Sequence, residues 1–348
     1  LPIIFPIFTF IVNFLLSKTP NKEMIKILDE EKPDLLIHPS VLQGSYIDDV
    51  IFYGNKIKKP VIVIMNSWDN PLTKRSVVNK NYFLLVWGPQ TKQHAIQYMG
   101  LKEENVVEFG SAQFDIYNHD KSNDWESLRQ DYGFKDDVKT LLYAGSSKNS
   151  DEFSHLKKID SAIEKGLLPK LNLIYRPHPW GNCGYEGYRF KEYNFKNVIF
   201  DFSMKDYVLR DFKKGPLKVL PNLKNTKDLL LSVDLVISPL STILLEAMLV
   251  GKIPICLMTN DEITADHFHR VKGSPHFKEI LENENVVVIN GVNNLIKGIK
   301  KAINYSLIES KSISLKKQSE FFISRFEESY DLRILKFVEN INERWSSF

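Results

Sequence analysis

From residue 21 onward, short apolar runs alternate with amphipathic stretches along the chain. The apolar runs are rich in Val, Ile and Leu and predict buried strands, whereas the stretches between them carry the apolar spacing of helices. We predict strands over residues 34–38, 61–65, 82–87, 106–109, 139–144, 173–176, 234–237 and 254–257. We predict helices over residues 21–31, 48–58, 91–100, 125–132, 243–250 and 314–345. Because strands that alternate with helices usually pair in parallel, the pattern predicts an α/β fold with mostly parallel sheets.

A polar segment, residues 118–124, separates two halves that both show this alternation. We therefore expect an N-terminal domain over residues 1–120, a C-terminal domain over residues 121–325 and a final helical segment over residues 326–348. The length of 348 residues suffices for two domains, and the 43 % of apolar residues can supply two cores.

Residues 1–16 are almost wholly apolar, and no charge occurs before Lys18. The run is shorter than the roughly 20 residues of a spanning helix and lacks the Met and basic start of a secretory signal. We expect that the native start is missing and that this segment forms a core helix. A membrane-facing segment and the tail of a spanning helix are the alternatives.

The predicted strand 234–237 runs into Ser238-Pro-Leu-Ser241-Thr242, which then opens an apolar helix. Ligands of open α/β sheets lie outside the carboxyl ends of strands, so this turn belongs to a candidate ligand crevice. The hydroxyls and the helix N-terminus suit phosphate oxygens. Plain helix capping by the hydroxyls is the alternative.

The predicted strand 173–176 ends in the same way, in Arg176-Pro-His178-Pro179. An arginine offers a planar fork for phosphate, and prolines on both sides restrict the backbone at the histidine. Together with Ser238, Ser241 and Thr242, these residues predict a nucleotide or phosphate site.

The two motifs, with Glu246-Ala and Gly251-Lys-Ile-Pro254 after them, resemble the donor-binding domain of GT-B glycosyltransferases over residues 140–257. The resemblance is closest to enzymes that use cytidine nucleotides: CDP-glycerol glycerophosphotransferases, bacterial Kdo transferases and sialyltransferases. It implies two Rossmann-like domains that face a central cleft, and a C-terminal helix that crosses back to the N-terminal domain.

The resemblance also implies roles for single residues and for the substrates. His178, Pro179, Ser241 and Thr242 would contact the nucleotide, and Glu246 would face its ribose. The donor would be CMP- or CDP-linked in preference to UDP-linked, and no further cofactor is expected. The acceptor would be a saccharide or a lipid-linked saccharide in the synthesis of a bacterial surface polysaccharide or glycoconjugate.

A third loop, Gly145-Ser146, follows the predicted strand 139–144. In GT-B enzymes the corresponding loop faces the donor phosphates, and glycine allows the backbone to approach them closely. An ordinary strand-to-helix loop is the alternative.

The N-terminal half contains one dense polar segment, Asn66 to Arg75, directly after a predicted strand. Asp69 is our candidate for the general base of an inverting reaction, or for the nucleophile of a retaining one. Lys74 or Arg75 would neutralise the departing phosphate, and Trp68 and His38 would lie on the acceptor side. The alternative is an Asx-turn with Trp68 packed beneath it.

Histidines and acids also cluster over residues 261–276, where Asp266 and His269 would touch the donor sugar. We do not predict a metal site there, because no cysteine joins the cluster and the segment follows a strand as a donor loop does.

The overall composition excludes several other classes of protein. The net charge is +3, and basic residues are dispersed among acids, so a nucleic-acid partner is not expected. The two cysteines predict no disulfide framework and fit a cytoplasmic protein, with peripheral contact to the inner face of the plasma membrane as an open alternative. The rival functions are a UDP-N-acetylglucosamine 2-epimerase, whose Ser-Gly-Gly turn is replaced here by Ser238-Pro-Leu-Ser241, and a non-catalytic nucleotide-sugar binding protein.

Overall fold

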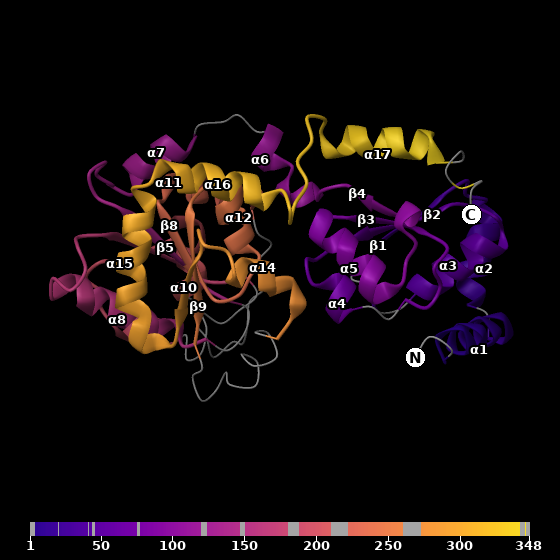
Figure 1. The fold of residues 1–348 in the computed structure, drawn as a ribbon, viewed down its shortest axis with the longest axis horizontal. Helices are drawn as coiled ribbons and strands as arrows, with labels where there is room; N and C mark the ends of the chain where they lie inside the picture. Colours follow the sequence, from indigo (N-terminus) through magenta and orange to yellow (C-terminus); the bar gives the residue numbers. More distant parts are fainter. Residues whose placement is uncertain are drawn as a thin grey trace. The chain divides into compact units, whose positions relative to one another are not determined.

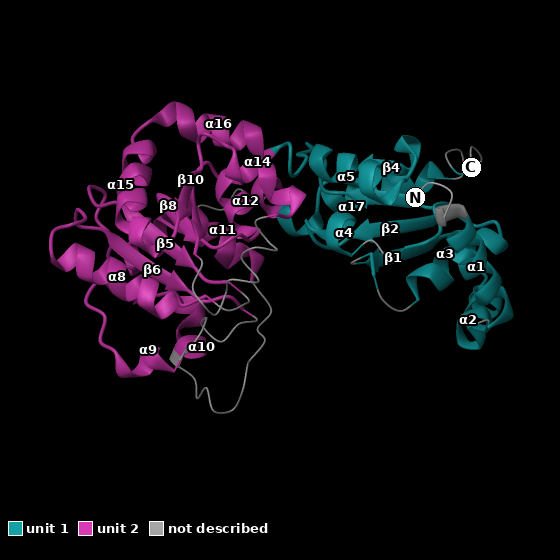
Figure 2. Cartoon of the chain, turned by 60° about the horizontal axis from the view of Figure 1, so that its bottom comes forward, with its two compact units in different colours: residues 1–115, 320–348 teal, residues 116–319 magenta. Residues whose placement is uncertain are grey.

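The chain forms two compact units, shown in Figure 2: unit 1 comprises Leu1–Asp115 and Glu320–Phe348, and unit 2 comprises Ile116–Ser319. The computed structural model describes residues 4–19, 21–40, 42–43, 46–74, 77–119, 124–146, 150–179, 188–209, 222–259, 273–341 and 345. Each unit is built around one parallel sheet with helices against it (Figure 1). The α/β fold with two Rossmann-like domains is thereby confirmed.

Unit 1 contains a four-stranded sheet whose strands follow one another in chain order. They are β1 (Leu36–Ser40), β2 (Val61–Met65), β3 (Phe83–Val86) and β4 (Val106–Glu108). The α-helices of unit 1 are α1 (Ile4–Lys18), α2 (Lys22–Glu31), α3 (Ile47–Lys56), α4 (Asn70–Thr73), α5 (Pro89–Met99) and α17 (Tyr330–Glu339). Two 3₁₀ turns, η1 (Glu103–Asn105) and η2 (Ala112–Phe114), flank β4.

Both faces of this sheet are covered at its central strand β2, where Val61, Ile62 and Val63 are fully buried. Val61 lies against Gly54 of α3, where a Cβ would approach the valine to 2.4 Å. The next residue, Ile62, points to the opposite face and packs with Phe83 and Phe337 of α17. The C-terminal part of the chain therefore completes the core of unit 1.

The prediction of a single helix over residues 314–345 is wrong. Helix α16 ends at Ser319, α17 begins at Tyr330, and the chain passes from unit 2 to unit 1 between them. The intervening backbone pairs with unit 1: Gln90 N–H donates to the Phe321 carbonyl (3.0 Å), and Ser324 N–H donates to the Trp87 carbonyl (2.8 Å). The phenylalanine spacing that suggested one helical face instead arises because this segment packs against the core of unit 1.

Helix α1 does not form the core helix that we expected. Its apolar side chains are between 46 % and 71 % exposed at Ile7, Phe8, Phe10, Ile11, Phe14 and Leu15. Within the described ranges, no helix combines the length and the apolar character needed to cross a bilayer.

Unit 2 contains a six-stranded parallel sheet in the order β10-β9-β8-β5-β6-β7. The strands are β5 (Thr140–Ala144), β6 (Asn172–Arg176), β7 (Val198–Phe200), β8 (Leu235–Ser238), β9 (Ile253–Met258) and β10 (Val287–Asn290). Its longer helices are α7 (Asp124–Asp131), α8 (Glu152–Glu164), α11 (Leu223–Ser232), α12 (Ile243–Leu249), α15 (Leu295–Ser306) and α16 (Glu309–Ser319). Shorter helical segments are α6 (Ile116–His119), α9 (Arg189–Glu192), η3 (Phe202–Met204), α10 (Lys205–Leu209), η5 (Pro275–Phe277), α14 (Lys278–Leu281) and η6 (Val292–Asn294).

Candidate functional site

The strand order of unit 2 reverses between β5 and β8. From β5 the chain adds β6 and β7 on one side, and it then returns to place β8 against the other side of β5. Ligands of open parallel sheets bind outside the carboxyl ends of the strands at such a reversal. Gly145 and Ser146 directly follow β5, and Ser238 is the last residue of β8. Two of the three predicted nucleotide loops therefore lie at the reversal.

The loop from β8 to α12 holds a pair of hydroxyl groups. Ser238 is fully buried, and its Oγ lies 2.9 Å from the Oγ of Ser241, which is half-buried. The Thr242 side chain makes no capping hydrogen bond to α12. The structure therefore does not show Thr242 as a capping side chain. The hydroxyls of Ser241 and Thr242 can donate hydrogen bonds to a phosphate.

His178 and Pro179 follow β6, and both are half-buried. Burial, followed by the positive charge of Arg176, lowers the pKa of His178 to about 4. The imidazole is therefore neutral near pH 7 and can offer a ring N–H to an anion, but no positive charge.

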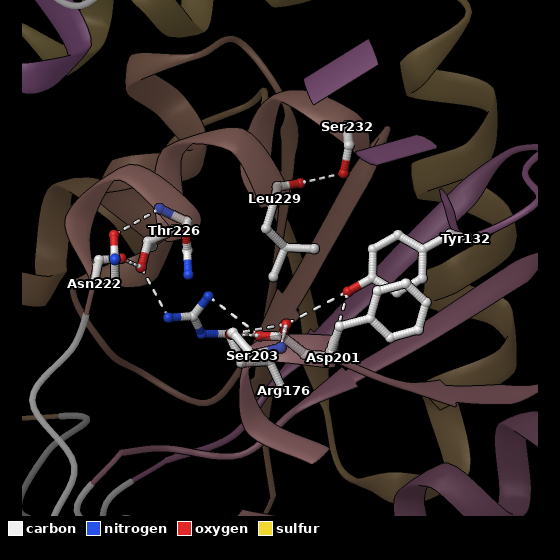
Figure 3. Close-up of polar contacts among 10 residues, drawn as sticks. Tyr132, Arg176, Asp201, Ser203, Asn222, Thr226, Leu229 and Ser232 are labelled. Carbon is white, nitrogen blue, oxygen red and sulfur yellow. Dashed lines mark hydrogen bonds and ion pairs between the residues drawn. The ribbon is translucent and has the colours of Figure 1, made fainter. Parts of the chain in front are cut away.

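Arg176, the last residue of β6, is turned into the domain and is only 7 % exposed (Figure 3). One amino group donates to Thr226 Oγ1 (2.8 Å), and the other lies 3.3 Å from the carboxylate of Asp201. Asp201 in turn accepts hydrogen bonds from the Tyr132 hydroxyl (3.4 Å) and from Ser203. These contacts give Arg176 a supporting role inside unit 2. The amino group that pairs with Asp201 makes no hydrogen bond to any described residue, so the phosphate contact of Arg176 stays a prediction.

A carboxyl group that the sequence analysis missed lies beneath the loop after β5. Glu152, the first residue of α8, is fully buried and accepts hydrogen bonds from the Ser146 N–H (2.7 Å) and the Tyr175 hydroxyl (2.6 Å). Gly145 passes so close that a Cβ would lie 2.5 Å from a Glu152 oxygen. Burial raises the pKa of Glu152 to about 7, although both hydrogen bonds act in the other direction. In the sequence, Glu152 could not be distinguished from the acidic residues that commonly begin helices.

Glu246 of α12 also has a partner that sequence reasoning did not find. The hydroxyl of Tyr117, on α6, donates to Glu246 Oε2 at 2.7 Å across a separation of 129 residues. Burial raises the pKa of Glu246, while Tyr117 and the charge of Arg176 lower it. No local pattern could have connected these two residues.

The polar segment of unit 1 is tightly hydrogen-bonded around Asp69. Its carboxylate accepts from the hydroxyls of Ser67 (2.8 Å) and Thr73. Trp68 is 2 % exposed and donates its ring N–H to Gln90 Oε1 (2.6 Å), so the structure places this residue in the core and not on an acceptor surface.

His38, which we predicted at the end of a strand, lies within β1, two residues before the strand ends. Burial lowers the pKa of its imidazole. Lys74 follows α4 directly and is half-buried. The structure therefore places His38, Asp69 and Lys74 in one unit, after or near the carboxyl ends of β1 and β2.

Two predicted donor-sugar residues, Asp266 and His269, lie outside the described residues, as does Arg75. Within the described part of the chain, no group of three or more His, Cys, Asp or Glu residues is placed to hold a metal ion. Residues 261–272 of the cluster of histidines and acids lie outside the described residues.

Comparison with known proteins identifies similar folds. No protein-family model matches the sequence, and no curated protein sequence matches it. A UDP-N-acetylglucosamine 2-epimerase from Neisseria meningitidis, bound to UDP-N-acetylglucosamine, is 13 % identical with a TM-score of 0.55, covering 92 % of this chain and 80 % of that one. A UDP-N-acetylglucosamine 2-epimerase from Methanocaldococcus jannaschii is 16 % identical with a TM-score of 0.52, covering 90 % and 80 %.

A variant of the wall teichoic acid polymerase TagF is similar to the same extent. It is 13 % identical with a TM-score of 0.52, covering 89 % of this chain and 74 % of that one. At these identities, the similarity shows the two-domain fold alone.

Proposed function

We propose that this chain is an enzyme of the GT-B kind that uses a nucleotide-activated donor, and that unit 2 binds the donor. The observation that carries the proposal is the reversal of the sheet between β5 and β8. This reversal brings the Gly145 loop and the Ser238–Thr242 loop to adjacent strand ends, with His178 after the neighbouring strand. The similar structures support it, since one of them is an epimerase bound to UDP-N-acetylglucosamine.

Each group has a role in this proposal. Ser241 and Thr242 donate hydroxyl hydrogen bonds to the donor phosphates, and neutral His178 adds a ring N–H. Ser238 orients Ser241 through their 2.9 Å contact. Glu246, whose orientation Tyr117 fixes, accepts from the ribose hydroxyls.

The reaction that we propose is transfer of a glycosyl or glycerophosphate group, with Asp69 as the general base. The hydroxyls of Ser67 and Thr73 hold the Asp69 carboxylate in one orientation, as a base requires. Asp115 is a weaker candidate, because it accepts from the Tyr330 N–H (2.9 Å) and pairs with Arg333 (3.4 Å) inside unit 1.

A cytidine donor, a saccharide or lipid-linked acceptor and a role in surface polysaccharide synthesis are the finer parts of the proposal. They rest on the resemblance of the His178-Pro179 and Ser241-Thr242 motifs to enzymes that use cytidine nucleotides. We also propose that no metal is required. Arg176 would contribute less positive charge toward the leaving nucleotide than expected, because it is paired with Asp201.

A 2-epimerase is the second candidate, because two of the compared structures carry that name. The two activities differ in their products: an epimerase returns an intact nucleotide-sugar, and a transferase releases the nucleotide or, for glycerophosphate, its monophosphate.

A two-stage experiment tests the proposal. Thermal shift with CMP, CDP, UMP, UDP, GDP and ADP identifies the nucleotide that stabilises the fold. NMR of the corresponding activated donor then distinguishes epimerisation from nucleotide release. Stabilisation by cytidine nucleotides and release of nucleotide support the transferase, whereas stabilisation by UDP and epimerised sugar support the second candidate. Stabilisation by no nucleotide refutes both.

A further inference from the structure

Glu152 places a carboxyl group against the Gly145-Ser146 loop, which lies at the reversal of the sheet where we propose that the donor binds and which the resemblance to GT-B enzymes places against the donor phosphates. The Ser146 N–H donates to Glu152 Oε1 (2.7 Å), and the bare Cα of Gly145 allows this contact, since a Cβ would lie 2.5 to 2.9 Å from the carboxyl atoms. The loop backbone therefore packs against a carboxyl group and not against an apolar side chain.

The titratable groups around Glu152 do not neutralise it. On α8, Asp151 is a second acid, which lies 3.9 Å from the guanidinium of Arg189, and His155 bonds through Nδ1 to the Tyr143 hydroxyl of β5 (2.8 Å). From β6, Tyr175 donates to Glu152 Oε2 (2.6 Å). Within the described residues, no lysine or arginine forms an ion pair with Glu152.

A buried carboxyl without a cation is poised to change its charge near neutral pH. Burial raises the pKa of Glu152 to about 7, the hydrogen bonds from Tyr175 and Ser146 lower it, and the charge of Asp151 raises it. Either protonation state is compatible with the contacts: as a neutral acid, Glu152 still accepts from Ser146 through its carbonyl oxygen, and its hydroxyl can donate to Tyr175.

We infer that binding of a donor diphosphate at the β5 loop is coupled to uptake of one proton by Glu152. The inference rests on the proposed donor site. A carboxylate that is buried against the loop and a diphosphate that binds to the loop repel each other, so the diphosphate binds more tightly to the neutral form of Glu152. By reciprocity, the bound diphosphate increases the proton affinity of Glu152. The step is –CO₂⁻ plus H⁺ from solvent to give –CO₂H, with no other bond made or broken.

Isothermal titration calorimetry of the full chain tests the coupling. The probes are CDP-glycerol and UDP-N-acetylglucosamine, whose diphosphates have no group that titrates near neutral pH. Titrations at about pH 7.5 in two buffers with different ionisation enthalpies count the protons, and we expect uptake of up to about 0.8 proton per donor, the fraction of Glu152 ionised at that pH. The donor Kd should rise with pH, by at most about tenfold per unit above pH 7.

Two variants separate Glu152 from other groups. Glu152→Gln keeps an acceptor for Ser146 but cannot titrate, so it should take up no proton and bind with a Kd that is nearly independent of pH. Glu164→Gln is the matched control, because Glu164 lies at the other end of α8 and pairs with Lys196 (3.1 Å); it should behave as the wild type.

The outcomes distinguish the inference from the proposed function. Donor binding to the wild type without proton uptake overturns the inference alone, and this count needs no variant. The same pH dependence in Glu152→Gln as in the wild type also overturns it. If the wild type binds neither donor, the inference is overturned, and the proposed function falls with it only when no nucleotide of the thermal-shift panel stabilises the fold.

Discussion

The buried ion pair between Arg176 and Asp201 predicts that removing Asp201 alone costs more stability than removing both partners. Asp201→Asn leaves a guanidinium that is only 7 % exposed with Thr226 as its remaining acceptor, and a buried charge without its partner costs about 3–5 kcal/mol in the free energy of unfolding. Arg176→Met should cost less, about 1–3 kcal/mol, because Asp201 keeps its hydrogen bonds from Ser203 and Tyr132. The double variant should be more stable than Asp201→Asn alone.

Urea unfolding measures these differences. Hydrogen-exchange mass spectrometry of peptides from β5 and β6 shows whether the loss of stability lies in unit 2. The control is Asp34→Asn in unit 1, whose partner Lys59 lies 2.8 Å away but whose side chain is 96 % exposed. Exposed pairs contribute little to stability, so this variant should match the wild type.

The opposite pattern would refute the supporting role of Arg176. If Arg176→Met keeps wild-type stability but weakens nucleotide binding by a decade or more, the guanidinium contacts phosphate as the sequence had suggested. A cost of Asp201→Asn no larger than that of the control would likewise remove the pair as a stabilising element.

The remaining predictions concern single side chains of the candidate site. Because folding raises the pKa of Glu152 from 4.5 to about 7, the wild type loses stability as pH rises through that interval. Glu152→Gln should therefore be up to about 3 kcal/mol more stable than the wild type above pH 7 and no more stable than it near pH 4.5. Urea titrations across this range check the prediction, and equal stability of the two proteins at pH 8 contradicts it. His178→Ala and Ser241→Ala should each raise the nucleotide Kd by about one to two decades at an unchanged melting temperature, and unaltered Kd values in calorimetry would remove these residues from the site. Asp69→Asn should lower turnover by roughly 10²- to 10⁴-fold with donor affinity unchanged, and wild-type nucleotide release would exclude Asp69 as the base.

The sequence predicted those parts of the fold that depend on local burial. The strands β2 and β8 are continuous apolar runs bounded by polar residues, and such runs are buried on both faces wherever they lie in a parallel sheet. The edge strands β7 and β10 were not predicted. All three side chains of β7 are only half-buried, so its pattern does not distinguish that strand from a loop. Strand β10 begins with three apolar residues, a run that the prediction overlooked.

The candidate site was predictable only where its residues are neighbours in the sequence. The loops after β5, β6 and β8 carry local signals, since each places polar residues directly after a buried strand. The contacts that define the roles of Arg176 and Glu246 depend on Asp201 and Tyr117, which tertiary packing brings from other segments. Trp68 shows the same limit, because its indole could serve a ligand or a core until Gln90 is known to lie beside it.

The discontinuity of unit 1 determines the order in which the chain can fold during synthesis. Unit 2 is one uninterrupted segment and can close its sheet once Ser319 has left the ribosome, whereas the face of the unit 1 sheet that contains Ile62 and Phe83 has to wait for Phe337. Translation at roughly 5–20 residues per second keeps that apolar face uncovered for on the order of 10 to 40 seconds while residues 116–319 are made. During this interval the face is a point at which nascent chains can aggregate. Unit 1, although most of its residues are made before unit 2, is thus the later of the two to complete its core.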